Sequence, residues 1–362
     1  MPSSEVSVME QILDLARWAP SGDNTQVWRF EVVSPFHVAV HCFDTREYCI
    51  YDYNGRASQI AMGALLENLK IAASIHGLAS DIARRSASTE ERPVFDVRFA
   101  PSASVGVDPL SAFVTIRSVQ RRSLKTRPLS HREKKALEQA AGEKYQVIWL
   151  EGWKSRLDMA KLLFHNAKLR LTAPEAYQVH SQVIEWNAHY SEDRVPDHAI
   201  GLDPVGTWLM RYAMQSWERV EFFNKYLAGT WLPRIQLDLL PGLFCAAHFI
   251  LVAKEPPVSI DHYLCAGRQI QRFWLTATQL DLQLQPEITP LIFRAYVRDS
   301  RHFSGVSGLF ERAAMLTGLL NDLVGSAAAD SAVFMGRIGG GQQPKARSLR
   351  RPLEELLIKP VQ

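Results

Sequence analysis

The sequence predicts an α+β protein whose chain folds as two related core units. Segments typical of strands and of helices follow each other along most of the chain. A strand, a short polar connection and a long apolar helix occur twice, around residues 36–78 and around residues 242–282. The length of 362 residues also exceeds the roughly 250–300 at which a single core stops growing.

The first element is a helix followed by a sharp turn. In "SVMEQILDLARWAP" Ser7 and Glu10 have the spacing of a capping box, and Pro20 follows the helical pattern. The stretch "APSGDNTQVWRF", residues 19–30, then places small polar residues directly before a strand that starts at Trp28, which we expect in the core. By its residue types alone, the stretch is equally typical of a simple helix-to-strand connection.

The rest of the first half consists of two strands separated by a long helix. "FHVAVHCF" alternates as a strand does, and "PVFDVRFA" is a further strand. Between them, "SQIAMGALLENLKIAASIHGL" is apolar around most of its circumference and ends at Gly77, so we expect this helix in the middle of the protein.

The second half repeats this order with a large insertion. Ser130 and Glu133 form a second capping-box pattern in "SHREKKALEQAAG", and "YQVIWLEG" is a strand. Residues 155–235 are helical and rich in tryptophan. A buried strand within "LPGLFCAAHFILVAKEPP" and a long helix within "CAGRQIQRFWLTATQLDLQLQPEIT" follow, and the chain ends in a basic, glycine-rich tail.

An offset of 204 residues relates the two long helices. Ile71 falls on Leu275, Ala73 on Ala277 and Leu78 on Leu282. This agreement favours an internal duplication, and a chance likeness of two Ala/Leu-rich helices is the alternative.

The composition is that of a globular protein without a strong charge field. The chain is 47% hydrophobic and 22% charged. Its 41 basic and 38 acidic residues leave a net charge of +3, too small to indicate a nucleic-acid partner. The four cysteines form no CxxC motif, so we expect reduced thiols and a cytoplasmic protein. We find no signal peptide and no run of about 18 uncharged apolar residues, and so expect no membrane association.

The usual catalytic motifs are absent from the sequence. It contains no HExxH, GxSxG, Walker loop or GxGxxG after a strand, and its histidines are too scattered to predict a metal site. The segment "RRSLKTR", residues 121–127, combines arginine forks with a serine hydroxyl, a set suited to a phosphate group. A second basic cluster lies at residues 345–351. A solvated basic turn and a loose tail are the respective alternatives.

Four short motifs together resemble the FMN-dependent nitroreductase superfamily. Members of that family carry "RRSxR", "APSxxNxQPW", a "P-x-E/G" turn after a central helix, and an "RRPLEE"-like end. The corresponding stretches here are "RRSLKTR" (121–127), "APSGDNTQVW" (19–28), "LQPEIT" (284–289) and "SLRRPLEEL" (348–356). The resemblance covers most of the chain except the helical insertion, and "QVW" replaces the usual "QPW".

The resemblance implies a cofactor, FMN, and assigns it binding residues. The FMN phosphate and ribityl chain would be held by Arg121, Arg122, Ser123 and Lys125, with Arg350 or Arg351 closing on the phosphate. The ring or its ribityl oxygens would be bordered by Pro20, Ser21, Gly22 and Asn24. Its reactive edge would be covered by Pro286 and Glu287. Asn24 should then lie across the ligand from Arg121.

The order of the motifs departs from the family in one respect. The family has "RRS" before "APS" in one subunit and builds its site between two subunits, whereas "APS" comes first here. Two fused, diverged copies with one working site would give this order, as in the pseudo-dimeric, Acg-like branch. The resemblance thus implies halves at 1–115 and 116–330, with a helical lid inserted at about 155–235 and a basic arm at 331–362. Each half would contain a mixed or antiparallel sheet flanked by helices.

The implied activity is hydride transfer from NAD(P)H through flavin N5 to a small aromatic, quinone-like or biosynthetic acceptor. The flavin would carry the chemistry, so no catalytic side chain is assigned. Two alternatives stay open: an FMN-binding or flavin-sequestering protein without turnover, and a flavin-free binding protein that uses its basic clusters. We expect a small-molecule substrate and no nucleic acid, and favour a monomer over a homodimer. Related domains also suggest an association with an E1-like adenylylating protein.

Overall fold

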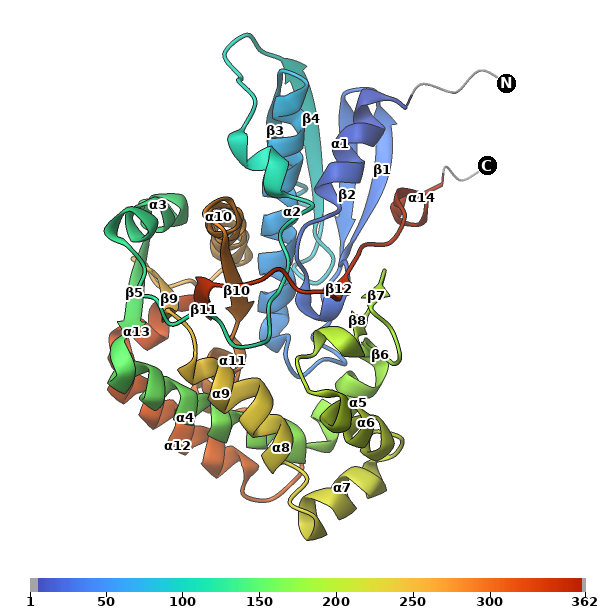
Figure 1. The fold of residues 1–362 in the computed structure, drawn as a ribbon. Helices are drawn as coiled ribbons and strands as arrows, with labels where there is room; N and C mark the ends of the chain where they lie inside the picture. Colours follow the sequence, from blue (N-terminus) through green and yellow to red (C-terminus); the bar gives the residue numbers. More distant parts are fainter. Residues whose placement is uncertain (1–5, 360–362) are drawn as a thin grey trace.

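A computed structural model describes residues 6–359, which form two antiparallel sheets with helices between and around them (Figure 1). The first sheet has the strand order β1-β2-β4-β3, and each neighbouring pair is antiparallel. Two helices belong to this half. The elements are α1 (Val8–Ala16), β1 (Trp28–Ser34), β2 (His37–Cys42), α2 (Arg56–Ile75), β3 (Leu78–Arg84) and β4 (Val94–Pro101).

The second sheet has the strand order β10-β11-β9-β5 and is also antiparallel throughout. Its helices α3 and α10 occupy the places that α1 and α2 have in the chain order of the first half. The elements are α3 (His131–Ala141), β5 (Tyr145–Glu151), β9 (Ala247–Ala253), α10 (Ile260–Gln279), β10 (Leu282–Pro286) and β11 (Ala332–Gly340).

The two sheets have the same topology. Read from β5, the second sheet runs β5-β9-β11-β10, which matches β1-β2-β4-β3 strand for strand. In each sheet the long helix, α2 or α10, connects the second strand of the half to the third. The expected α+β class with antiparallel sheets is therefore confirmed.

The two long helices pack against each other at the centre of the molecule. A Cβ atom at Gly63 would clash with the carbonyl oxygen of Leu264, and one at Gly267 would clash with that of Ile60. Any larger residue would push the helices apart. Gly63 and Gly267 are 204 residues apart, as are Ile60 and Leu264.

Polar contacts across this helix pair follow the same offset. Arg272 donates to Glu67 over 2.9 Å, and Gln271 donates to Asn68 over 2.7 Å. Adding 204 to 67 and 68 gives 271 and 272, so Glu67 contacts the counterpart of Asn68, and Asn68 contacts the counterpart of Glu67. Such reciprocal contacts are those of a two-fold interface.

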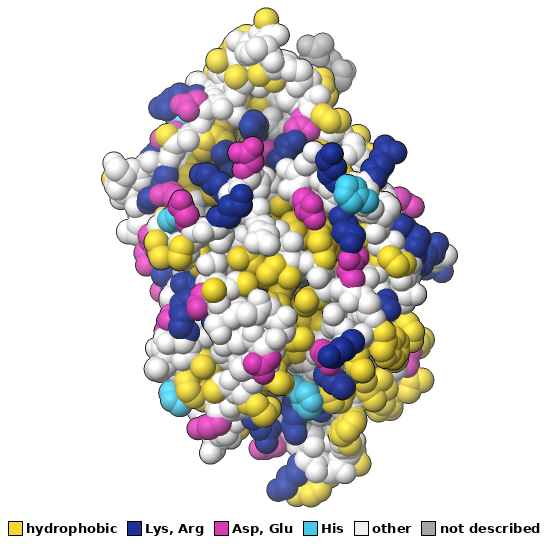
Figure 2. Space-filling model, turned by 90° about the vertical axis from the view of Figure 1, so that its left-hand side faces the viewer, with side chains coloured by type: hydrophobic (Ala, Val, Ile, Leu, Met, Phe, Trp, Pro, Cys, Tyr) yellow, Lys and Arg dark blue, Asp and Glu magenta, His cyan; other side chains and the backbone are white. Residues whose placement is uncertain are grey.

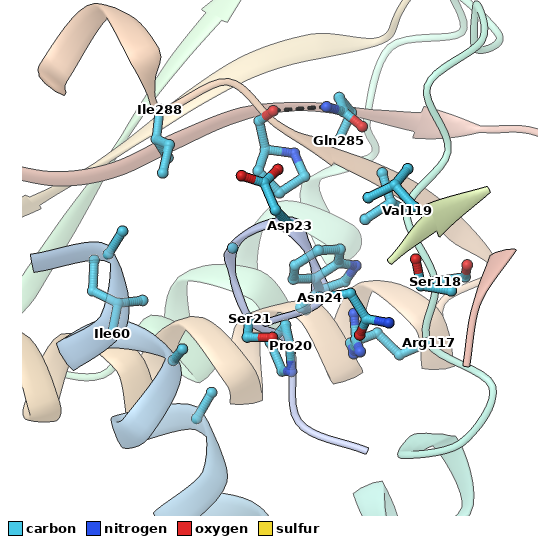
Figure 3. Close-up of a pocket in the computed structure, with 18 of the residues that line it drawn as sticks. Pro20, Ser21, Asp23, Asn24, Ile60, Arg117, Ser118, Val119, Gln285 and Ile288 are labelled. Carbon is cyan, nitrogen blue, oxygen red and sulfur yellow. Dashed lines mark hydrogen bonds between the residues drawn. The ribbon is translucent and has the colours of Figure 1, made fainter. Parts of the chain in front are cut away.

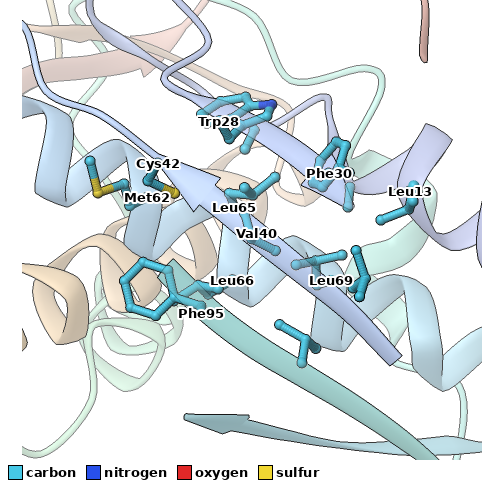
Figure 4. Close-up of a cluster of buried hydrophobic side chains, with 14 of the residues drawn as sticks. Leu13, Trp28, Phe30, Val40, Cys42, Met62, Leu65, Leu66, Leu69 and Phe95 are labelled. Atoms are coloured by element: carbon cyan, nitrogen blue, oxygen red, sulfur yellow. The ribbon is translucent and has the colours of Figure 1, made fainter. Parts of the chain in front are cut away.

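The core of the first half forms where α2 meets the first sheet. Trp28, Phe30 and Leu69 are fully buried there, and Figure 4 shows them gathered between α2 and the strands. The expectation that Trp28 belongs to the core is confirmed. Both predicted capping boxes are also present, since Ser7 and Ser130 each accept from the backbone N–H three residues later.

Residues 152–246 connect β5 to β9, whereas residues 35–36 make the equivalent connection in the first half. This insertion is mostly helical, as expected, with three very short strands. Helix α4 packs against α12 beside the second sheet, and α6 and α7 lie apart from it (Figure 1). The elements are α4 (Gly152–Thr172), α5 (Pro174–Val183), β6 (Ile184–Glu185), β7 (Tyr190–Ser191), β8 (Val195–Pro196), α6 (Pro204–Ala213), α7 (Trp217–Tyr226), α8 (Trp231–Pro233) and α9 (Leu240–Leu243).

The C-terminal segment returns from the second sheet to the first (Figure 1). Residues 332–340 are the strand β11, so the arm begins only after Gly340. It pairs with β7 through β12, and the Ile358 amide donates to the Phe30 carbonyl over 2.7 Å. The remaining helices and strand are α11 (Thr289–Arg298), α12 (Leu309–Val324), α13 (Ser326–Ser331), β12 (Arg347–Ser348) and α14 (Leu353–Leu356).

No helix among residues 6–359 combines the length and apolarity needed to cross a membrane. Within the same range, we find no group of three or more His, Cys, Asp or Glu side chains placed to bind a metal ion.

Candidate functional site

A cavity of about 240 Å³ lies where the two halves meet. The first half contributes the turn at residues 20–24 and one side of α2. The second half contributes residues 117–121, α10 and the end of β10. Residues 195–199 of the insertion and 347–350 of the C-terminal arm complete the wall (Figure 3).

One wall of the cavity is apolar. Ala57, Ala61 and Ala64 of α2 face it with small side chains, and Trp274 of α10 adds an aromatic surface. Gly22 has no atom within 4 Å of the position a Cβ would take, so the backbone of the turn is open to a ligand there. Such a wall suits the face of a planar ring.

One end of the cavity is cationic. Arg117, Arg347 and Arg350 lie near one another there, together with the hydroxyls of Ser118 and Ser348, whereas Arg121 lines the cavity nearer to Asp23. In Figure 3 Arg117 and Ser118 lie on one side of the cavity, away from Ile60 and Ile288. No carboxylate of residues 6–359 forms an ion pair with any of these four arginines.

Burial makes the positive charge at this end costly. Arg117 is 3% exposed, and burial together with the charges of Arg350 and Arg347 lowers its pKa well below the usual range. Burial likewise lowers the pKa of Arg350 to about 9, with Arg347 and Arg17 as further causes. A bound anion would offset this repulsion, because it would supply the missing opposite charge.

Several polar atoms around the cavity lack a hydrogen-bond partner among the described residues. They are Nε of Arg117, Nε of Arg347 and Oε1 of Gln285. The amide nitrogen of Gln285 donates to the Pro286 carbonyl over 2.9 Å, which leaves its oxygen as a free acceptor. Buried polar atoms are normally satisfied, so unpaired ones beside a cavity indicate that a polar ligand completes the site.

Apart from Asp23, the polar side chains of the turn are committed to the protein itself. Ser21 accepts from the amide of Gln26 over 2.9 Å. Asn24 accepts from Arg350 over 2.9 Å and donates to the carbonyl of Glu192 over 3.1 Å. Gln26 also donates to Glu192 and accepts from the amide of Arg351. The turn therefore fastens the insertion and the C-terminal arm to the first half.

Left-handed backbone makes this arrangement achievable. Asp23, Asn24 and Gln26 have φ values of 49°, 63° and 50°. Asn and Asp tolerate this conformation better than other non-glycine residues do. Asp23 and Asn24 therefore suit the left-handed backbone of this turn.

The cavity brings together seven of the twelve residues expected at the FMN site and leaves five outside. Arg122, Ser123 and Lys125 are exposed and do not line the cavity. Arg351 turns toward the insertion, where it pairs with Asp193 over 2.9 Å. The seven that line the cavity are Pro20, Ser21, Gly22, Asn24, Arg121, Pro286 and Arg350.

Glu287 is the fifth residue outside the cavity, and it has a buried partner on each side. Its carboxylate is 2.7 Å from Nδ1 of His248 and 2.7 Å from Nη1 of Arg337. Burial opposes both charges, but the two cations lower the pKa of Glu287, and Glu287 raises the pKa of His248 to about 10. Arg337 in turn donates to the Arg121 carbonyl over 2.6 Å. Glu287 therefore supports the cavity wall from behind.

Sequence reasoning did not single out Arg117, Ser118 and Ser348 as site residues, and it missed Trp274. A signal was available for the first three, because an Arg-Ser pair occurs at 117–118 and again at 347–348. The tryptophans of the insertion, expected to cover the ring, do not line the cavity; from that region only Val195 and Ala199 do.

Comparisons with known proteins add little. No protein-family model matches the sequence, and no curated protein matches it. Among solved structures, a nitroreductase-like family protein from Bacillus cereus matches over 70% of this chain and 96% of its own, with 12% identity and a TM-score of 0.34. A likeness this weak carries no argument, so the function has to be inferred from the site.

Proposed function

We propose that this protein binds FMN in the cavity between its halves and acts as an NAD(P)H-dependent oxidoreductase. The observation that carries the proposal is the polarity of the cavity, which is apolar along α2 and is lined elsewhere by four arginines that have no acidic partner among residues 6–359. FMN has this same division into a planar ring and an anionic phosphate. The four motifs that resemble the nitroreductase superfamily favour FMN over other ligands of this shape.

The residues at the cationic end fit a phosphate group. Arg117, Arg347 and Arg350 would hold it with the hydroxyls of Ser118 and Ser348. Arginine binds phosphate through two parallel hydrogen bonds, which suits a site of several forks around one anion. This assignment replaces Arg122, Ser123 and Lys125, whose side chains face solvent.

The remaining lining residues fit the ring. Ala57, Ala61 and Ala64 leave room for a flat group above α2, and Trp274 and Pro286 border it. Gln285 would accept a hydrogen bond from a ring N–H through its free oxygen. When bound, FMN would supply two-electron chemistry at its ring, and the protein would bind, orient and shield it from water.

The matching sheets support an internal duplication as the origin of this site. The strand orders agree, and the central helices make reciprocal contacts at an offset of 204 residues. Fused copies would form one such cavity from the turn of the first half and the arginines of the second. A helical region covering the site would then be a feature of the second copy alone.

A nucleic-acid-binding role has less support. Lysine and arginine side chains alternate with acidic ones on the face drawn in Figure 2, without a continuous basic surface. Of the arginines of the second basic cluster that line the cavity, Arg350 is buried and Arg347 is half-buried. A cavity cannot admit a duplex or a long strand.

The test is a titration of the purified apo-protein with FMN and with riboflavin, followed by anaerobic addition of NADH or NADPH. We expect saturable FMN binding at least 100-fold tighter than riboflavin binding, because riboflavin lacks the phosphate. We also expect NAD(P)H to bleach the flavin absorbance. Equal affinities would contradict the phosphate assignment, and tight binding without bleaching would contradict the enzymatic part.

A further inference from the structure

Among the charged residues that line the cavity, Asp23 alone makes neither a hydrogen bond nor an ion pair within residues 6–359; the four arginines each donate a hydrogen bond to the protein. It lies at the centre of the turn that faces the apolar wall, and Figure 3 shows it among the lining residues, between Pro20 and Ser21 on one side and Gln285 on the other. No described residue forms an ion pair or a hydrogen bond with its carboxylate. All other polar side chains of residues 21–26 are bonded within the protein.

From this geometry we infer that Asp23 is a catalytic proton donor to the acceptor that the reduced flavin converts. The inference rests on the proposed function. The acceptor gains two electrons and one proton as a hydride from the flavin, and its oxygen gains a second proton from the Asp23 carboxyl. A quinone thus becomes a hydroquinone, and the resulting Asp23 carboxylate regains its proton from solvent.

The surroundings of Asp23 favour a protonated carboxyl. Burial raises the pKa of Asp23, although the charges of Arg121 and Arg170 oppose this effect. Cys49 and Tyr51 lie near it, in the loop between β2 and α2. Burial raises the pKa of Cys49 to about 12 and that of Tyr51 above its usual value, so neither carries a charge near neutral pH.

His180 completes the surroundings as a neutral group. It stacks on Tyr51, whose hydroxyl lies 3.1 Å from its Nε2, and burial lowers the pKa of His180 to about 3. Of Asp23, Cys49, Tyr51 and His180, Asp23 is the one that lines the cavity, and its raised pKa favours the protonated form that a proton donor needs.

Arg121 gives the acceptor a second contact. It lines the same cavity as Asp23, and each side chain shifts the pKa of the other by charge attraction. A guanidinium beside an acid suits an acceptor whose oxygen becomes negative as the hydride arrives. The pair therefore favours carbonyl or nitro oxygens on a flat ring over acceptors that take single electrons.

The test compares wild-type protein with Asp23→Asn, loaded with FMN, reduced anaerobically, and reoxidised by p-benzoquinone or by ferricyanide. Ferricyanide takes electrons without a proton, so we expect the ratio of the quinone rate to the ferricyanide rate to fall about 100-fold in the variant. In the wild type, the quinone rate should decline as pH rises past the pKa of Asp23, and the variant should lack this decline. Asn also tolerates the left-handed backbone at this position, so the fold should persist.

A second readout needs no flavin. The raised pKa means that folded apo-protein holds a proton more tightly than the unfolded chain, so Asp23 lowers the free energy of unfolding as pH rises from about 4 through the folded pKa. Asp23→Asn should remove this part of the pH dependence, and Asp81→Asn, on the exposed side of β3, should retain it. An unchanged rate ratio in a variant that binds and bleaches FMN normally would overturn the inference. A wild type that fails to bind or bleach FMN would instead overturn the proposed function.

Discussion

Two identical dipeptides five residues apart have opposite environments. Arg117 and Ser118 line the cavity, whereas Arg122 and Ser123 are exposed. Residues 117–121 run beside β10, whose end lines the cavity, since Val119 bridges Leu284 in parallel fashion. The chain then leaves the cavity at Leu124, whose amide donates to the Phe244 carbonyl over 2.7 Å.

This difference shows that a phosphate-binding composition is not sufficient to make a site. Arg122, Ser123 and Lys125 have the residue types that suit a phosphate, and water solvates all three. Arg117 has the same chemistry, but it is buried beside other cations and stacks over Trp274 at 4.6 Å. Position in the fold, and not residue type, separates the two.

The largest effect should come from removing two arginines of the cationic end. We expect Arg117→Met with Arg347→Met to weaken FMN binding about 100-fold or more, since each charge-assisted bond contributes about 1.5–3 kcal/mol. The matched variant, Arg122→Met with Lys125→Met, should bind FMN within about twofold of wild type. Fluorescence titration with FMN measures both, and a larger loss in the matched variant would reverse our assignment of the two segments.

Removing one of these arginines should weaken FMN binding but stabilise the apo-protein, and this second effect should be smaller. Arg117 is a buried cation without an anionic partner, so Arg117→Met should raise the free energy of unfolding by about 1–3 kcal/mol. Arg122→Met, at an exposed position, should change it by less than about 0.5 kcal/mol. Chemical denaturation in the absence of FMN is the measurement. A destabilised Arg117→Met would mean that the arginine is structural.

The smallest effect should distinguish the two serines. Ser118→Ala removes one hydroxyl from the cavity, and we expect a roughly fivefold loss of FMN affinity, equivalent to about 1 kcal/mol. Ser123→Ala should leave the affinity unchanged. The same titration decides this, and equal effects at both positions would place the phosphate elsewhere.

Much of the fold was predictable because its signals are local. The capping boxes at Ser7 and Ser130 and the two long helices each depend on residues within a few turns. Trp28 was correctly expected in the core. The pairing of the C-terminal arm with β1 and β7 has no such signal, because its hydrogen bonds join segments far apart in the chain.

The candidate site was predictable in part. The turn at 20–24 and Arg350 were expected near a ligand and do line the cavity. Glu287 was expected to cover the ring, but its pairing with His248 and Arg337 requires two other strands to lie beside it. Arg117 lines the cavity where Arg122 was expected, because residues 117–121 are the ones that run beside β10.

The sequence by itself determined which elements form and which kinds of side chain are available. Helical periodicity, capping residues and turn formers act over a few residues, so they can be read without a fold. Only the tertiary structure decided which arginines meet, which lose their water and which aspartate is left without a partner. These properties arise from packing between distant segments: Arg117 is buried without an acidic partner, and the Asp23 carboxylate has no hydrogen-bond partner among residues 6–359.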